Sequence, residues 1–245
     1  MRESFSGVVG QSRNARMSVT SATQSATFTA DELIVETSAG QQYRLSAFNK
    51  TMNLSATGAG GMDTGSVPSS GFIALYAILN PTNGATALLA VNATAASVPE
   101  IYGGANMPAG YTASALVSVW RVASGQFTVG EMVGRQINTP ELPLVTVTNT
   151  VSTLTELSIS SVIPKNAKMM DGWGLINSVQ TATNNSFAVS SRLYSICFRT
   201  HGSSNSGVSA TFSNLLIVEP QKIYYQVGFG GTPTPSTIYS TGYSF

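Results

Sequence analysis

"GFIALYAILNPTNGATALLAVNAT", residues 71–94, decides the fold class of this chain. Two apolar, strand-like runs flank the turn sequence Asn80-Pro81-Thr82-Asn83-Gly84. Pro81 presets one backbone angle of a turn, and Asn83-Gly84 can adopt positive φ angles. The stretch therefore predicts a β-hairpin, and it defines the period of two residues to be sought elsewhere in the chain.

Strand-type patterns extend from this hairpin in both directions. Residues 15–37 alternate apolar and small polar residues around a turn near Ser21–Ser25, and residues 115–137 read as a second hairpin turning at Ala123-Ser124-Gly125. Short strand-like runs continue from residue 145 onward, while helical periodicity is almost absent. We therefore predict an all-β protein, with an N-terminal antiparallel β domain followed by a C-terminal β-sandwich of jelly-roll-like arrangement.

Proline and glycine divide the chain further. The two prolines of "NTPELPL" (138–144) predict a domain boundary, which gives domains at residues 1–140 and 141–245. The Gly- and Pro-rich segment 97–113 predicts a long surface loop between two hairpins. Long ordered loops often carry function or subunit contacts.

The charge content is low and nearly balanced. Charged residues make up 9% of the chain, and 12 Lys and Arg face 11 Asp and Glu for a net charge of +1. This balance disfavours nucleic acid and anionic membranes as partners. Because Ser and Thr, roughly a quarter of the residues, must then carry much of the surface, we expect other subunits to cover part of it. A neutral, Ser/Thr-coated extracellular monomer is the alternative.

No targeting or membrane segment is expected. The N-terminal sixteen residues contain charges but no apolar core of a signal peptide, and no run reaches the roughly 18 apolar residues of a membrane span. We expect a chain made in a cytoplasm that is not inserted into a membrane. The single cysteine, Cys197, excludes an intrachain disulfide, and its apolar alternating context predicts a buried thiol.

Asp63-Thr64-Gly65-Ser66 spells the catalytic tetrapeptide of aspartic proteases. Such proteases need two carboxylates that share a proton, and neither Asp31 nor Asp171 lies in a second copy of the motif. Only a dimeric protease would satisfy the chemistry. Because a flexible glycine-rich segment precedes Asp63, we favour a turn before the next strand. The glycines also lack the Gly-Lys-Ser/Thr of a phosphate-binding loop.

Other site chemistry is sparse in this sequence. The only histidine, His201, lies in a polar run that predicts an exposed loop, and with Cys197 alone it cannot build a zinc site. We expect no cofactor, no metal and no catalytic residue. Aromatic and amide side chains in turn-like contexts could suit sugar rings instead, although for Trp173 we favour core packing at the end of a sandwich. The candidate receptor-binding residues are Tyr102, Asn106, Tyr111, Trp173, His201 and Asn205.

Several segments together resemble tail fibre and tail appendage proteins of tailed bacteriophages. They are Phe28–Thr37, Tyr43–Ser46, Gly58–Ser66, Ala74–Ala90 and Tyr102–Trp120, with "VIPKNAKMMDGWG" (162–174) and the stretch from Pro220 to Phe245 in the second half. The resemblance covers nearly the whole chain, and its motifs are structural rather than catalytic.

The resemblance implies a virion protein, located in the phage tail, that acts in recognition of the host surface and adsorption. It implies a homotrimer that contacts other tail proteins and a bacterial surface glycan or protein receptor. By the same analogy the N-terminal domain attaches to the virion and the C-terminal domain forms the tip. The alternatives are a purely structural virion component, such as a decoration, collar or baseplate protein, and a dimeric aspartic protease using Asp63.

Overall fold

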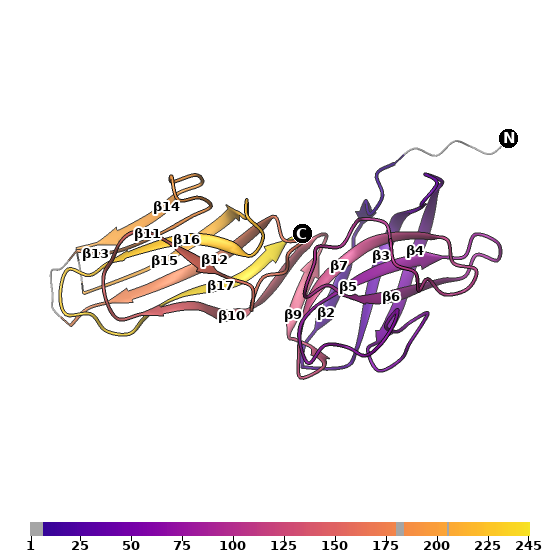
Figure 1. Cartoon of the computed structure of the whole chain (residues 1–245), viewed down its shortest axis with the longest axis horizontal. Coiled ribbons are helices and arrows are strands. Elements are labelled where there is room, and N and C mark those ends of the chain that lie inside the picture. Colours follow the sequence, from indigo (N-terminus) through magenta and orange to yellow (C-terminus); the bar gives the residue numbers. More distant parts are fainter. Residues whose placement is uncertain (1–6, 180–183, 205) are drawn as a thin grey trace. The chain divides into compact units, whose positions relative to one another are not determined.

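The computed structural model describes residues 7–179, 184–204 and 206–245 (Figure 1). These residues form β-strands joined by turns and loops, with no helix among them. The strands pair antiparallel throughout the two sheets, which confirms the predicted all-β class. Contacts between Cα atoms divide the chain into two compact units, Met1–Ile137 and Asn138–Phe245. The proline-based prediction had placed the division between residues 140 and 141.

The first unit is built on one long, curved set of paired strands. β4 pairs with β3 along most of its length, and the order continues from β3 through β7 and β5 to β6. On its other edge β3 pairs with β1 and β2, and β2 pairs with β9. The strands are β1 (Ser12–Arg13), β2 (Arg16–Val19), β3 (Ser25–Thr37), β4 (Gln42–Asn53), β5 (Ser70–Leu79), β6 (Thr86–Asn92), β7 (Ala113–Ala123), β8 (Gln126–Phe127) and β9 (Gly130–Val133).

The hairpin predicted at residues 71–94 is confirmed as β5 and β6. Leu79 pairs with Thr86 at the turn, and the Asn80 amide donates a hydrogen bond to the Ala85 carbonyl at 2.8 Å. Gly84 adopts a φ of 75°, a region that L-residues with a side chain rarely enter. The turn chemistry in the sequence therefore set the register of this hairpin.

The centre of the first unit is buried on both faces of its sheet. Every residue from Phe72 to Leu79 in β5 and from Ala113 to Trp120 in β7 is buried. Strands covered on both sides read as continuous apolar runs rather than as alternating ones. The predicted loop 97–113 contains no strand before Ala113, the first residue of β7. This loop covers part of the sheet, since Tyr102 packs edge-on against Tyr76 with ring centroids 5.6 Å apart.

β4 contains one residue in the left-handed region of backbone conformation. Ala47 has a φ of 50°, and the ladder between β3 and β4 skips the pair that it would form with Asp31. Leu45 and Phe48 are both buried, although a spacing of three would place them on opposite faces of a regular strand. The irregular residue therefore resets the alternation, so that Phe48 and Lys50 face the same side as Leu45.

The second unit contains two facing sheets (Figure 1). β15, β12, β17 and β10 are neighbours in one sheet, and β11, β16, β13 and β14 form the other. The strands are β10 (Gln136–Val147), which enters from the first unit, β11 (Val151–Ser158), β12 (Met169–Asn177), β13 (Asn185–Ser190), β14 (Arg199–Ser203), β15 (Gly207–Leu216), β16 (Lys222–Gly228) and β17 (Ser236–Ser244).

Glycines on β12 leave space for aromatic side chains in the core of the second unit. A Cβ atom placed on Gly174 would lie 2.8 Å from the ring of Phe187 on β13, and one on Gly172 would lie 2.5 Å from the ring of Phe212. Both rings are buried. The absence of side chains at these two positions therefore makes room for the aromatic core of a sandwich-like unit. The jelly-roll arrangement stays a prediction.

The segment 138–144, whose prolines predicted a domain boundary, begins the second compact unit, and its prolines lie in the extended strand β10. One local prediction is wrong. The apolar run after Ser190 was predicted to continue a strand through Cys197, but residues 191–198 form turns between β13 and β14. Cys197 has a φ of 53° and is half-buried, so its thiol does not lie in the core.

Candidate functional site

The candidate residues fall into two groups, one in each unit. Tyr102, Asn106 and Tyr111 lie on the loop 97–113 of the first unit, and Trp173 and His201 lie on strands of the second. Asn205 lies outside the described residues.

Tyr102 is the centre of a hydrogen-bonded cluster. Its hydroxyl donates to Asp63 Oδ2 at 2.9 Å and accepts a hydrogen bond from the Asn106 backbone amide at 3.1 Å. Its own backbone amide donates to the hydroxyl of Ser114 on β7 at 2.9 Å. The side chain is only 8% exposed, so Tyr102 packs the loop against the sheet and its hydroxyl is already used inside the protein.

The remainder of the loop is anchored in the same way. Glu100 and Arg135 form a bidentate ion pair with three N–O distances between 2.9 and 3.0 Å. The Tyr76 hydroxyl donates to the Pro99 carbonyl at 2.6 Å. Asn106 is exposed and Tyr111 is half-buried. The loop therefore presents these two side chains from a firmly held backbone, which lowers the entropy lost when a partner binds.

Burial makes the hydroxyls of Tyr76 and Tyr102 weaker acids than a tyrosine hydroxyl in water. Desolvation, followed by the negative charge of Glu100, raises the pKa of Tyr76 far above its ordinary value of 10.0. Desolvation and then the hydrogen bond to Asp63 also raise the pKa of Tyr102. Both hydroxyls therefore remain protonated donors at neutral pH, as their hydrogen bonds require.

Asp63 lies on a segment that pairs with the edge of β6. Its backbone amide donates to the Ala90 carbonyl at 2.8 Å. Its carboxylate accepts from the Thr64 amide at 2.8 Å through Oδ1 and from Tyr102 through Oδ2. Both oxygens are thus engaged within the chain. This arrangement favours a structural role for the Asp-Thr-Gly-Ser turn, which holds the loop 97–113.

Trp173 lies on the outer face of the sheet that contains β12 and β17. It stacks on Tyr239, with ring centroids 4.8 Å apart and an angle of 14° between the rings. Trp173 is half-buried, while its neighbours in sequence, Gly172 and Gly174, face the core. The indole therefore does not close the end of the sandwich. Trp173 and Tyr239 form a stacked pair on the surface of the sheet, here called the aromatic pair.

Next to the aromatic pair, the neighbouring strand β15 carries short polar side chains on the same face. Thr211 of β15 is the cross-strand neighbour of Trp173, and Ser209 and Ser213 lie two residues to either side. All three are exposed, and β15 is the last strand of its sheet. The face of the indole turned toward β15 therefore meets a hydroxyl-rich strip without a large side chain. An aromatic face beside hydroxyl groups suits the stacking and hydrogen bonding of a sugar ring.

His201 is on strand β14 rather than in the exposed loop that the sequence predicted. It pairs with Phe187, and the two rings lie 5.2 Å apart at an angle of 31°. The polar residues around His201 gave no strand signal in the sequence, and the residues of β14 alternate between half-buried and exposed. His201 does not lie with the aromatic pair, because its sheet is the other layer of the unit.

An apolar surface cluster was missed at the sequence level. Five large apolar side chains are between 44% and 72% exposed on two neighbouring segments of the second unit. The segments are held together by the Ser191 hydroxyl, which donates to the Leu216 carbonyl, and by the Arg192–Glu219 ion pair. We call this set the apolar patch; it comprises Leu193, Tyr194, Ile196, Leu216 and Val218.

The described residues contain no group of three His, Cys, Asp or Glu side chains placed to hold a metal ion. None of the elements in the described part of the chain is a helix of the length and apolar character needed to cross a membrane. A scan against protein-family models finds no match for this chain, and a search of the curated proteins finds none either.

Proposed function

We propose that this chain is a structural protein of a bacteriophage virion, a tail fibre or tail appendage that takes part in host-surface recognition. The observation that carries the proposal is the aromatic pair Trp173 and Tyr239, which stands on an outer sheet face beside the hydroxyl-rich strand β15. This surface fits a bacterial glycan. No catalytic residue is part of the proposal.

The apolar patch supports the expected self-association. Monomeric proteins rarely expose a contiguous group of large apolar side chains, and such patches commonly mark interfaces. The low charge content of the chain points the same way, since only 9% of its residues are charged. We propose a homotrimer in which the apolar patch is covered by a neighbouring subunit or by another virion protein.

Binding of labelled protein to a panel of bacterial strains and to their purified surface glycans tests the recognition role. Trp173→Ala is expected to weaken binding at least about tenfold, as is usual for a central aromatic anchor, and Trp173→Phe to weaken it less. Tyr111→Ala is the matched comparison on the loop 97–113. If Tyr111→Ala loses binding and Trp173→Ala does not, the glycan contacts the loop 97–113, and the aromatic pair is not the binding site.

The purely structural alternative predicts a different outcome from the same material. A decoration, collar or baseplate protein would bind other virion proteins, and it would bind to none of the bacterial strains. The native mass, from light scattering, is the first measurement. A trimer supports the tail appendage. A monomer favours a module that is stable only when docked on a virion. A dimer would favour the dimeric aspartic protease, in which Asp63 is one of the two catalytic carboxylates. In the dimer, proteolysis lost in Asp63→Asn would support the protease.

A further inference from the structure

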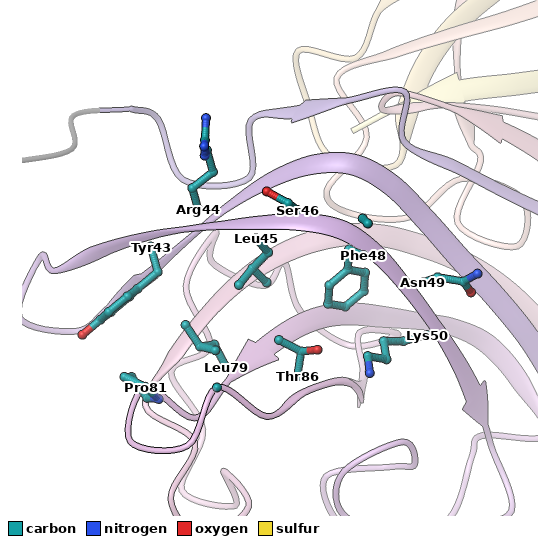
Figure 2. A pocket seen from close by; sticks show the side chains of 12 residues that line it. Tyr43, Arg44, Leu45, Ser46, Phe48, Asn49, Lys50, Leu79, Pro81 and Thr86 are labelled. Carbon is teal, nitrogen blue, oxygen red and sulfur yellow. The ribbon is translucent and has the colours of Figure 1, made fainter.

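The first unit contains a cavity of about 500 Å³ between β4 and the tip of the β5–β6 hairpin (Figure 2). We call it the β4–β6 groove. Leu45 and Phe48 from β4 and Leu79 from β5 supply its apolar wall, and each is less than 9% exposed. Its volume lies within the range of small-molecule sites. The groove is lined by residues 43–50 together with Leu79, Pro81, Gly84 and Thr86.

The groove exists because two strand edges do not join. Among the described strands, β4 pairs only with β3, and β6 pairs only with β5. At one end the gap is closed by the segment before Asp63, where the Asn53 amide donates to the Gly60 carbonyl and the Gly60 amide donates to the Leu88 carbonyl. Among the described residues, no comparable backbone hydrogen bonds join residues 43–50 to Thr86, so the two strand edges stay apart there.

The left-handed residue Ala47 determines which side chains enter the groove. Figure 2 shows Leu45 and Phe48 on the side of Leu79, while Arg44 points to the opposite side of β4. Because Ala47 resets the alternation, Lys50 lies on the inner side with Phe48. Strained backbone residues of this kind are retained where the surrounding structure requires them, and often beside binding sites.

Lys50 supplies the charge of the groove, because the side chain of Arg44 points to the opposite side of β4. Among its lining residues Arg44 and Lys50 are cationic and none is acidic. Arg44 already pairs with Glu32 at 3.6 Å. Lys50 makes no ion pair with any described residue, although its side chain is half-buried beside an apolar wall. An ammonium group in such a place is stabilised by an anion brought to it.

We propose that the β4–β6 groove binds a small organic acid, with an aromatic or branched aliphatic body against Leu45, Phe48 and Leu79 and its carboxylate on the Lys50 ammonium. The Thr86 hydroxyl, which also lines the groove, is a second donor available to the carboxylate. This inference does not rest on the proposed virion role, since the groove lies in the first unit and the aromatic pair in the second.

The test compares 4-phenylbutyrate with 4-phenylbutanol, which has the same apolar body and no charge. We expect the acid to bind the intact chain at least about tenfold more tightly than the alcohol in calorimetric titrations, since a hydrogen bond to a charged group adds that much affinity. Lys50→Met, which keeps an apolar stem and removes the charge, should erase the preference. Lys168→Met, the same change at an exposed site in the second unit, should preserve it.

Three results would overturn the proposal. The alcohol binds as tightly as the acid, Lys50→Met retains the preference, or the acid leaves the NMR signals of Leu45, Phe48 and Leu79 unchanged at saturating concentration. Circular dichroism of Lys50→Met distinguishes a lost contact from a lost fold. If that variant does not fold, Thr86→Val replaces it and is expected to weaken acid binding while sparing the alcohol.

Discussion

Replacing Tyr102 by phenylalanine tests whether the loop 97–113 is held by the cluster around Asp63. The substitution removes one hydroxyl and keeps the ring that packs on Tyr76. Two hydrogen bonds are lost, one to the Asp63 carboxylate at 2.9 Å and one from the Asn106 amide at 3.1 Å. A bond to a charged group contributes about 1.5–3 kcal/mol and a neutral one about 1 kcal/mol, before water replaces part of them.

Because Asp63 is half-buried and Asn106 exposed, water can reach both groups after the substitution. We therefore expect Tyr102→Phe to lower the free energy of unfolding of the first unit by about 2 kcal/mol, or about thirtyfold in the folding equilibrium. Trp120 is the only tryptophan of this unit and is 1% exposed, so its fluorescence reports unfolding. The assay is equilibrium urea unfolding in a Trp173→Phe background.

Tyr111→Phe is the matched control, because its hydroxyl lies on the same loop and makes none of these bonds; we expect a change within about 0.5 kcal/mol. A double-mutant cycle with Asp63→Ala should show a coupling above about 0.5 kcal/mol, as contacting residues do. An effect of Tyr102→Phe no larger than that of Tyr111→Phe would refute the reasoning. So would independent, additive losses in the cycle.

Three further predictions follow from packing and titration. Gly174→Ala should destabilise the second unit by about 1–3 kcal/mol through overpacking against Phe187, whereas Gly202→Ala, whose Cβ would have no neighbour closer than 3.7 Å, should be nearly neutral in urea unfolding. Since the folded pKa of Tyr76 is raised above 10.0, its contribution to stability is complete below that pH and is lost as the pH rises; the free energy of unfolding should fall more steeply above pH 10 in the wild type than in Tyr76→Phe. Tyr194→Ser should lower the native mass measured by light scattering if the apolar patch joins subunits, and an unchanged oligomer would count against that role.

The elements whose signals are local could be predicted from the sequence. The β5–β6 hairpin follows from the chemistry of its turn, and the turn at Ser124-Gly125 follows from residues that accept positive φ, observed at 50° and 69°. The loop 97–113 follows from its glycine and proline content. In each case a few adjacent residues carry both the signal and the structure.

The sites depend on residues that are distant in sequence. Tyr102 and Asp63 are 39 residues apart, and the aromatic pair requires the register of β12 against β17. Periodicity gives the faces of single strands but not which strands become neighbours. The alternating run before Cys197 shows a second limit of prediction from sequence. The same apolar pattern occurs in a strand of a core and in turns that carry an exposed apolar patch.

The place of β17 in its sheet has a consequence for synthesis. β17 lies between β12 and β10, yet it follows every other strand of the second unit in chain order. Until translation has passed Ser244, the facing edges of β10 and β12 have no partner, and such edges readily pair with other nascent chains. The first unit has all its strands once Val133 has emerged, so it can fold while the second is still being made. We therefore expect the window for aggregation on the ribosome to belong to the second unit alone.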